Sequence, residues 1–324
     1  MMETIEGVAV EARGLTKSYR RVPVLEGLTL EVPRSSVFAL LGPNGAGKTT
    51  TVRILATLLD ADGGEARVAG RDVRRERSEV RRRISLTGQY AAVDDLQTGE
   101  ENLRTIGRLA GLGGRASRLR AGELLEGFGL AEAAARRVGT YSGGMRRRLD
   151  LAASLVTEPE VLFLDEPTTG LDPPSRLELW KVVEELVAAG VTVFLTTQYL
   201  EDADRLADRI AVLDGGRIVA EGTADELKRG VAEDRLELRL DPDTRFTELL
   251  GRLDGRLLEA DPAERTLALR TDGTARDVRA LLDALDPDGT AVAEFALRKA
   301  TLDDVFLSLT GRTTRTTGKE MPGV

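Results

Sequence analysis

The sequence predicts an α/β fold with a buried parallel sheet, followed by a smaller α+β domain. Three observations lead to this prediction. Apolar strand-like segments alternate with helical segments over the first 230 residues, and a glycine-rich loop joins one such strand to a helix. Strands that are apolar throughout and alternate with helices are typical of α/β domains. After a break near residue 230, strand and helix patterns resume in the order βαββαβ, which is typical of a small ferredoxin-like domain.

The composition supports one large domain and one small one. The 324 residues are 41% hydrophobic and 31% charged, enough for a proper core and a well-solvated surface. The net charge of −8 disfavours nucleic-acid binding, which needs a basic face. Arginine runs at 74–75, 81–83 and 146–148 are expected on solvated or salt-bridged faces, with nucleotide or partner contacts as the alternative.

Missing residue types exclude several kinds of site. The chain has no cysteine and no histidine, so it has no disulfide, no thiolate or imidazole metal site and no histidine-based acid–base catalysis. The longest uncharged apolar segment, residues 186–200, falls short of the roughly 20 residues of a membrane helix. No signal-peptide pattern is present, so we expect no membrane span.

A phosphate loop follows the first fully apolar strand. Strands are predicted over 8–12 and 28–32, and a buried strand over 37–41 runs directly into the loop, before a helix over 51–58. Strand, glycine loop and helix form the context in which G-x-x-x-x-G-K-T binds phosphates, at the positive end of the helix. Lys48 is expected to neutralise the β- and γ-phosphates, and the Thr49 hydroxyl to bind Mg²⁺. The loop residues expected to bind nucleotide are Gly42, Pro43, Asn44, Gly45, Ala46, Gly47, Lys48, Thr49 and Thr50.

An acidic pair ends a second apolar strand. The strand predicted over 161–164 leads to Asp165 and Glu166. Asp165 is placed to hold Mg²⁺ through water, and Glu166 to act as general base toward the attacking water. A helix over 173–189 and a buried strand over 191–196 follow.

Between the loop and the acidic pair, residues 98–155 have helical spacing. Thr98 with Glu101 predicts a capping box at its start. Ser142, Gly143 and Gly144 precede a helix predicted over 145–155. They offer a hydroxyl and backbone donors, and so a second phosphate cradle without a lysine of its own; a simple N-cap serine is the alternative.

These elements, in this order, resemble the ATP-binding subunit of an ABC transporter over about residues 8–227. The resemblance implies a P-loop NTPase core with an inserted helical subdomain at about 98–155, ATP and Mg²⁺ as cofactors, and a homodimer closed head to tail on two ATP. It also implies that Tyr19 stacks on adenine, that Gln89 senses Mg²⁺ and the membrane partner, and that Asp172 links the two sites. A strand-edge aromatic and a turn residue remain the alternatives for Tyr19 and Gln89.

Two motifs depart from the family pattern: the signature, Tyr141-Ser142-Gly143-Gly144-Met145, and the switch position after the strand predicted over 191–196. Tyr141 and Met145 stand where the signature usually has leucine and glutamine, and Gln198 stands where the switch usually has histidine. Glutamine can donate a hydrogen bond but cannot carry a proton. We therefore expect Glu166 to be the base and Gln198 to be a catalytic residue that positions, with a bystander role as the alternative.

The C-terminal part predicts strands over 236–240, 257–260, 266–270 and 292–298, and helices over 246–253 and 275–285. A last helix over 302–309 has the capping pair Thr301 and Asp304. This last segment, the signature and the switch together resemble the daunorubicin-resistance subfamily of drug and antibiotic exporters. We expect an ATP-binding domain over 1–230, an accessory domain over 235–311 and a flexible tail over 312–324.

The expected function is ATP hydrolysis that drives drug efflux through a separate transmembrane permease subunit. The protein would lie at the cytoplasmic face of the membrane, bound only through that partner, and without nucleic acid. A lipid or polysaccharide exporter, or an importer, shares these motifs and stays open. A soluble ABC-type ATPase acting on the ribosome or DNA is the other alternative; the single phosphate loop and the absence of sustained heptads disfavour it.

Overall fold

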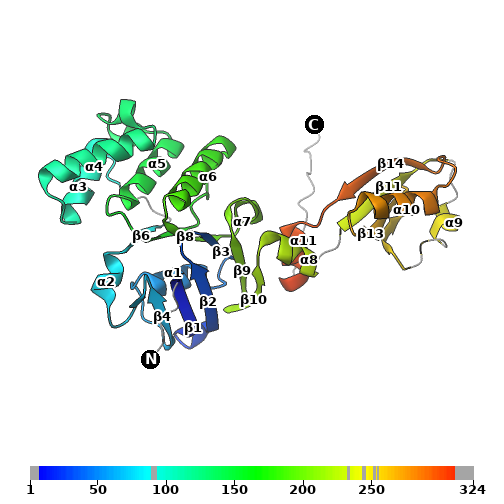
Figure 1. The fold of residues 1–324 in the computed structure, drawn as a ribbon, viewed down its shortest axis with the longest axis horizontal. Coiled ribbons are helices and arrows are strands. Elements are labelled where there is room, and N and C mark those ends of the chain that lie inside the picture. Colours follow the sequence, from blue (N-terminus) through cyan, green and yellow to red (C-terminus); the bar gives the residue numbers. More distant parts are fainter. Residues whose placement is uncertain are drawn as a thin grey trace, which may run out of the picture. The chain divides into compact units, whose positions relative to one another are not determined.

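The computed structural model of the chain describes residues 7–88, 93–231, 234–242, 246–250, 253 and 255–310. The chain divides into two compact units, residues 1–224 and 225–324, and Figure 1 labels most of their elements. The domain boundary predicted at residues 230–235 falls after helix α8 (Ala224–Val231). Most of α8 groups with the C-terminal unit.

An antiparallel sheet forms the first part of the N-terminal unit. Its strands are β1 (Val8–Tyr19), β2 (Val22–Pro33), β4 (Gly63–Val68) and β5 (Arg71–Asp72), in the order β2-β1-β4-β5. The first two strands are longer than the predicted 8–12 and 28–32, because both continue up to the two-residue turn that joins them. Arg20 and Arg21 of this turn have positive φ, 48° and 72°, as a tight hairpin turn requires.

A mostly parallel sheet forms the centre of this unit. Its strand order is β10-β9-β3-β8-β7-β6. The strands are β3 (Val37–Leu41), β6 (Ile84–Thr87), β7 (Val161–Asp165), β8 (Thr192–Thr197), β9 (Arg209–Asp214) and β10 (Arg217–Gly222). Neighbours are parallel except for β9 and β10, which form an antiparallel hairpin. The predicted buried strands at 37–41, 161–164 and 191–196 are confirmed, and β3, β8 and β7 are adjacent.

Alternating side chains of this sheet feed two hydrophobic cores. Phe38, Phe163 and Phe194 point to one face, with ring centroids 5.4 and 5.5 Å apart between neighbours, and pack with α1 (Lys48–Leu55) and the antiparallel sheet. Leu162 and Leu164 point to the other face and pack with helices. Because both faces of the central strands are covered, the ends of these strands are held in fixed positions.

Helices dominate residues 98–155, as predicted. They are α3 (Gly99–Leu109), α4 (Gly114–Gly127) and α5 (Gly143–Ser154), with short 3-10 turns at Ala131–Ala133 and Val138–Thr140; Figure 1 shows the three helices grouped together. The predicted capping box of Thr98 and Glu101 starts α3. The remaining helices of this unit are α2 (Arg77–Arg81), α6 (Pro173–Ala188) and α7 (Leu200–Leu206).

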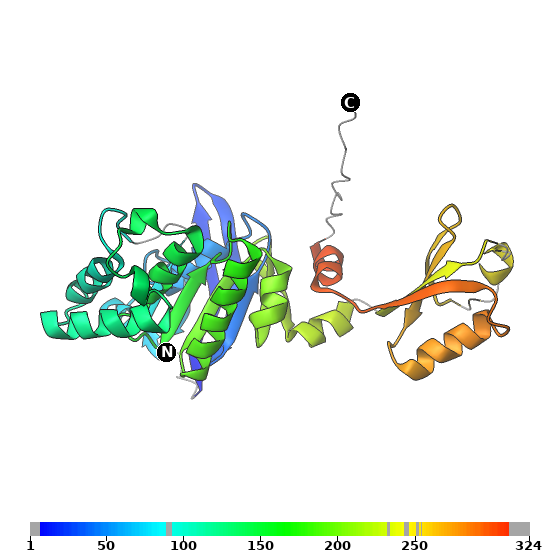
Figure 2. The ribbon, with the colours of Figure 1, turned by 90° about the horizontal axis from the view of Figure 1, so that it is seen from above.

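The C-terminal unit has the predicted βαββαβ order. Its elements are β11 (Asp234–Leu240), α9 (Phe246–Leu250), β12 (Leu257–Asp261), β13 (Thr266–Thr271), α10 (Ala275–Leu285) and β14 (Val292–Arg298). The antiparallel strand order is β12-β13-β11-β14, so the first strand lies between the third and the fourth, as in ferredoxin-like folds. Leu236 and Leu238 of β11 pack with Leu281 and Leu285, and Figure 2 shows α10 along one face of the sheet.

A last helix, α11 (Leu302–Thr310), follows this sheet. Its start is the predicted capping pair, since Asp304 N donates to Thr301 Oγ1 at 3.2 Å and Thr301 N donates to Asp304 Oδ2 at 3.0 Å. The tail predicted over 312–324 lies outside the described residues.

Candidate functional site

Three neighbouring strands of the parallel sheet end at the predicted site. β3 runs into the phosphate loop, β7 ends at Asp165 and β8 ends at Thr197. The strand register pairs Asp165 with Thr196 and Leu41 with Thr197. Because the carboxyl ends of parallel strands share one edge of a sheet, the loop, the acidic pair and the switch residue meet there, where open α/β sheets bind their ligands.

The phosphate loop is closed in by backbone on two sides. Gly47 has φ 112°, and a Cβ added to it would lie 2.7 Å from Leu25 Cδ2 and 2.9 Å from Val24 O. A Cβ on Gly42 would lie 2.4 Å from Leu213 O. A loop with this close approach and left-handed backbone needs glycine, and it fits a phosphate cradle.

Lys48 is the first residue of α1, and its side chain is only 4% exposed. Its Nζ donates to the carbonyl oxygens of Gly42 at 2.8 Å and Pro43 at 3.1 Å. The same atom lies 3.3 Å from Glu166 Oε1. A buried ammonium group needs such partners, so the ammonium is held at the loop, beside the acidic pair.

Asp165 accepts hydrogen bonds from two hydroxyl groups. Its Oδ1 accepts from Thr49 Oγ1 at 3.2 Å and from Thr196 Oγ1 at 2.5 Å. Thr49 and Asp165, two of the three residues expected to hold Mg²⁺, are therefore in contact. Mg²⁺ binds through few carboxylates together with substrate phosphates and water, and this donor pair fits it. Among the described residues, no group of three acidic side chains could hold a metal ion without such help.

Glu166 has a left-handed backbone, with φ 51°. Its N–H donates to Thr196 O at 3.0 Å, with Thr196 Oγ1 3.2 Å away. Left-handed backbone is uncommon for residues other than glycine and is concentrated at functional sites. This conformation accompanies the placement of the Glu166 carboxylate at Lys48. Thr196 was not predicted, although the paired threonines at the end of β8 could have signalled it.

Gln198 follows β8 directly and is half-buried. Its neighbours are fixed on both sides, because Tyr199 N donates to Thr197 Oγ1 at 2.9 Å and Gly42 N donates to Thr197 O at 3.4 Å. Within the described part of the chain, the side-chain amide of Gln198 forms no hydrogen bond. Asp202, four residues further along the chain, was not predicted from the sequence. It is fully buried, and burial raises the pKa of its carboxyl.

The serine–glycine turn starts α5 as predicted. Ser142 Oγ accepts from Met145 N at 3.2 Å, and Ser142 itself is exposed. A Cβ on Gly144 would lie 2.5 Å from Ser175 Oγ, and that hydroxyl donates to Asp172 Oδ1 at 2.6 Å. The Ser175 hydrogen bond holds the pKa of the Asp172 carboxyl below its usual range. Gly144 of the turn therefore packs against Ser175, which in turn binds Asp172. Ser175 was not predicted from the sequence.

Tyr19 is the last residue of β1 and is 43% exposed. Lys17 Nζ lies 5.9 Å from its ring centroid, and Lys17 in turn forms an ion pair with Asp62 at 2.7 Å. The ring is accessible on a hairpin whose second strand, β2, presses on Gly47 of the phosphate loop. An exposed aromatic face anchored beside the loop can stack on a nucleotide base.

Comparison with known proteins identifies the family. A family model described as "ABC transporter" matches residues 25–169, and one described as "ATP-binding protein DrrA1-3-like, C-terminal domain" matches residues 222–310. The chain is 52% identical over 320 residues to the daunorubicin resistance ATP-binding protein DrrA2 of Streptomyces coeruleorubidus, over 98% of this chain and 99% of the relative. The chain belongs to the ATP-binding proteins of ABC transporters. It binds and hydrolyses ATP as an ABC ATPase.

Further relatives agree with this assignment. The doxorubicin resistance ATP-binding protein DrrA of Mycobacterium tuberculosis is 46% identical over 317 residues, 94% of each chain. A solved structure of an ATP-binding subunit of an ABC transporter superposes with a TM-score of 0.62 and 30% identity, over 68% of this chain and 92% of that one. The predicted resemblance to ABC transporters and to the daunorubicin-resistance subfamily is confirmed.

One departure of this ABC ATPase from the usual signature has a structural cause. The Tyr141 hydroxyl donates to Ala133 O at 2.7 Å. A Cβ on Gly99 would lie 2.5 Å from that hydroxyl, so the absence of a side chain at the start of α3 makes room for it. Burial raises the pKa of the Tyr141 phenol.

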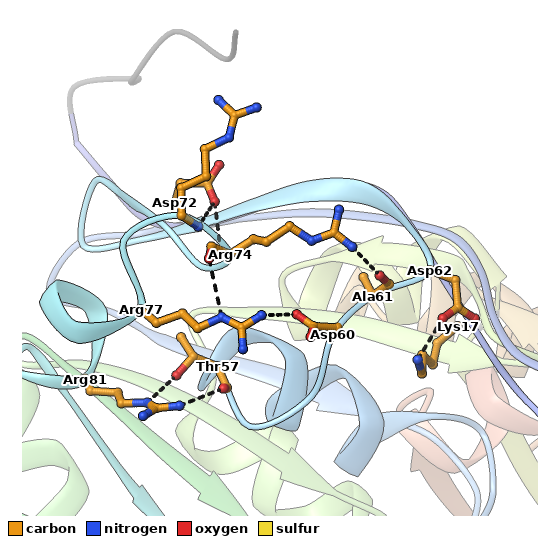
Figure 3. Close-up of polar contacts among 10 residues, drawn as sticks. Lys17, Thr57, Asp60, Ala61, Asp62, Asp72, Arg74, Arg77 and Arg81 are labelled. Carbon is orange, nitrogen blue, oxygen red and sulfur yellow. Dashed lines mark hydrogen bonds and ion pairs between the residues drawn. The ribbon is translucent and has the colours of Figure 1, made fainter.

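The arginine runs of this ABC ATPase lie on hydrogen-bonded and salt-bridged faces. Figure 3 shows Arg74 donating to Ala61 O at 3.0 Å and Arg81 donating to Thr57 Oγ1 at 2.8 Å. Ion pairs join Arg82 to Glu79, Arg83 to Glu160, Arg146 to Asp95, Arg147 to Asp150 and Arg148 to Glu178. The predicted salt-bridged faces are confirmed for the five arginines with ion pairs, whereas Arg74 and Arg81 bind neutral oxygens on exposed positions.

Two predictions about this ABC ATPase concern its contact with the membrane. Gln89, expected to contact Mg²⁺ and the membrane partner, lies outside the described residues. In the described ranges, none of the helices has the length and apolar content needed to cross a bilayer.

Proposed function

We propose that this ABC ATPase powers the export of drug-like compounds through a separate membrane subunit, to which it binds at the cytoplasmic face. The observation that carries the chemistry is the meeting of Lys48, Asp165 and Glu166 at one edge of the parallel sheet. The cargo class rests on the near full-length identity to the daunorubicin resistance protein. The matched C-terminal domain at residues 222–310 supports the same class.

The phosphate loop holds the triphosphate in this proposal, and Lys48 neutralises the β- and γ-phosphates. Thr49 and, through water, Asp165 hold Mg²⁺, which when bound supplies positive charge to the phosphate oxygens. Glu166 accepts the proton of the attacking water. Gln198 donates a hydrogen bond that positions the water or the γ-phosphate, because an amide can orient a group but cannot take its proton.

ATP binding changes the partners of Lys48 in this scheme. In the structure, the ammonium is held by two loop carbonyls and by Glu166 at 3.3 Å. Phosphate oxygens compete for the same ammonium, since charge-assisted bonds to phosphate are strong. Release from Lys48 leaves the Glu166 carboxylate free to accept a proton, so the base is made available by the substrate itself.

A second copy of the chain completes each site. Ser142 and Gly143 are exposed at the positive end of α5, where backbone donors attract a phosphate. We assign them, with Gly144, to the γ-phosphate held by the partner, and Asp172 to the loop between the two sites. Tyr19 stacks on adenine, and Gln89 contacts Mg²⁺ and the membrane subunit.

ATP-dependent pairing tests the dimer. The Glu166→Gln variant should bind Mg·ATP without turnover and elute as a dimer in size-exclusion chromatography with light scattering. Adding Ser142→Arg should leave ATP binding intact and give a monomer. Thr274→Arg, at an exposed N-cap of α10 that plays the same local role, is the matched control and should still dimerise. A dimer that persists with Ser142→Arg contradicts the shared site.

Drug export is tested in cells that express the chain with its membrane subunit. Efflux of daunorubicin from preloaded cells should stop with Glu166→Gln and continue with Glu178→Gln, an exposed residue of α6. Active ATP hydrolysis with no effect on drug retention would contradict the cargo class while leaving the ATPase chemistry in place.

A further inference from the structure

Asp202 is the carboxylate that the proposed chemistry leaves unused, although it lies next to the site. It sits in the first turn of α7, four residues after Gln198, with no exposed surface. Isolated buried carboxylates are costly, and such groups are kept where several donors hold them. Asp202 has such donors from three different segments of the chain.

The two oxygens of Asp202 face different parts of the molecule. Oδ2 accepts from Thr168 Oγ1 at 2.5 Å and from Thr197 Oγ1 at 3.1 Å. Oδ1 accepts from Trp180 Nε1 at 3.1 Å, and Arg176 Nε lies 3.9 Å from it. One oxygen therefore binds the segments that carry the site, and the other binds the middle of α6.

The Thr197 hydroxyl links Asp202 to the switch. It has one proton to donate, and Asp202 Oδ2 at 3.1 Å is nearer than Tyr199 O at 3.4 Å. The same hydroxyl accepts from Tyr199 N at 2.9 Å. The Thr197 hydroxyl thus binds both Tyr199 N and Asp202 Oδ2. Because Thr197 and Tyr199 flank Gln198, these bonds fix the backbone that carries the Gln198 side chain.

The Thr168 hydroxyl links Asp202 to the loop after the acidic pair. Thr168 is 1% exposed, and it lies two residues after Glu166. Its carbonyl oxygen accepts from Leu171 N at 3.1 Å, and Glu166 O accepts from Thr169 N at 3.3 Å. These bonds shape the turn from Glu166 to Asp172, so the Asp202 contact holds the start of that turn.

We infer that Asp202 is a positioning residue for ATP hydrolysis: its Oδ2 holds the switch and the loop after the acidic pair in one register, so that Gln198 and Glu166 act on the same water. The inference rests on the roles proposed for Gln198 and Glu166. A carboxylate suits this task because one oxygen can accept both hydroxyls at once. Small misplacement of such groups lowers the rate of the chemical step rather than the binding of substrate.

The test removes one contact of Asp202 at a time. Thr197→Val and Thr168→Val each delete one hydroxyl bond to Oδ2 with little change in volume, whereas Trp180→Phe deletes the bond to Oδ1. We expect each threonine variant to lower kcat about 10-fold, with KM for ATP within about 2-fold. Trp180→Phe is the matched control; it should lower the melting temperature and leave kcat within about 2-fold of wild type.

Combined variants test whether the threonines act through the carboxylate. Adding Asp202→Asn to Thr197→Val should lower kcat little beyond the larger single effect, since coupled groups are not additive. The inference would be overturned if the fold-losses in kcat of Thr197→Val and Asp202→Asn multiplied in the double variant. Equal losses of kcat in Thr197→Val, Thr168→Val and Trp180→Phe, or unchanged kcat in both threonine variants, would also overturn it.

Glu166→Gln and Gln198→Ala, measured beside these variants, separate this inference from the proposed function. If both abolish or slow hydrolysis while the threonine variants do not, Asp202 has no positioning role and the proposed function stands. If Gln198→Ala and Glu166→Gln leave the rate unchanged, the proposed roles fail, and the register that Asp202 was inferred to hold fails with them.

Discussion

Lys48 Nζ lies 3.3 Å from Glu166 Oε1, with the two side chains only 4% and 10% exposed. The lysine proposed to bind the phosphates and the carboxylate proposed as the base are therefore paired. The pair is assembled from the first residue of α1 and the residue that follows β7, two segments more than a hundred residues apart in the sequence. In the proposed mechanism, this contact links substrate binding to activation of the base.

Replacing the base should separate binding from chemistry. Glu166→Gln keeps the size and the hydrogen-bonding reach of the side chain but cannot accept the proton. We expect ATP binding to persist and turnover to fall roughly 10²–10⁴-fold, measured by phosphate release. An ATPase rate equal to wild type would show that another group takes the proton. Glu178→Gln, with the same substitution at an exposed position, should hydrolyse ATP normally.

The switch residue should act by orientation. Gln198→Ala removes the amide that can donate to the water or the γ-phosphate, whereas Gln198→His restores a donor at about the same reach. We therefore expect the alanine variant to hydrolyse ATP more slowly than the histidine variant, in single-turnover measurements. Equal and unimpaired rates in both variants would mean that the side chain is not used.

The glycines of the signature should differ in their tolerance of a methyl group. A Cβ on Gly144 would lie 2.5 Å from Ser175 Oγ, whereas a Cβ on Gly143 would meet no atom within 4 Å. Gly144→Ala must displace the Ser175 hydroxyl from Asp172, and we expect it to lower the melting temperature by about 2–4 °C. Gly143→Ala, the matched control, should keep or raise it. Ser175→Ala should relieve the clash in a double variant, and an additive loss instead would contradict this contact.

The stability contribution of Asp202 should depend on pH with a known sign. Burial raises the pKa of this carboxyl above its unfolded value of 3.8, so the folded state takes up the proton first. The stabilising contribution of protonation is fully present below the unfolded pKa and is lost as the pH rises through the folded pKa. Asp202→Asn cannot titrate.

The free energy of unfolding of wild type, relative to Asp202→Asn, should therefore increase as the pH falls from 7 toward 4. Urea unfolding at several pH values measures it, with Asp283→Asn on the exposed side of α10 as a control for the substitution. Arg176 is retained in both proteins, so its charge cancels in the difference. A difference that falls with decreasing pH would contradict the raised pKa.

Removal of the accessory domain should leave the nucleotide site intact. The described site residues lie between Tyr19 and Asp202, all in the first compact unit. We expect deletion of residues 236–324 to preserve ATP affinity, measured by fluorescent nucleotide binding, and to weaken assembly with the membrane subunit or its coupling. Loss of ATP binding in a truncated chain that is still folded would contradict the independence of the two units.

Local sequence was sufficient for the parts of the fold and site that depend on neighbours in the chain. The phosphate loop follows a buried strand, and the predicted capping boxes at Thr98 and Thr301 form. Asp165 is the last residue of its strand, and Glu166 follows it. Each of these features rests on backbone propensity or on hydrogen bonds between residues a few positions apart.

Contacts between distant segments could not be read in the same way. Asp202 binding Thr168 and Trp180, Thr196 binding Asp165, and Ser175 filling the space beside Gly144 all join different strands and helices. Tyr141 likewise depends on the empty side of Gly99. Chain order and residue type settled which chemistry this protein carries, because that chemistry is written in short motifs. The partner of each catalytic group was settled by strand register and packing, which bring together atoms that no local pattern relates.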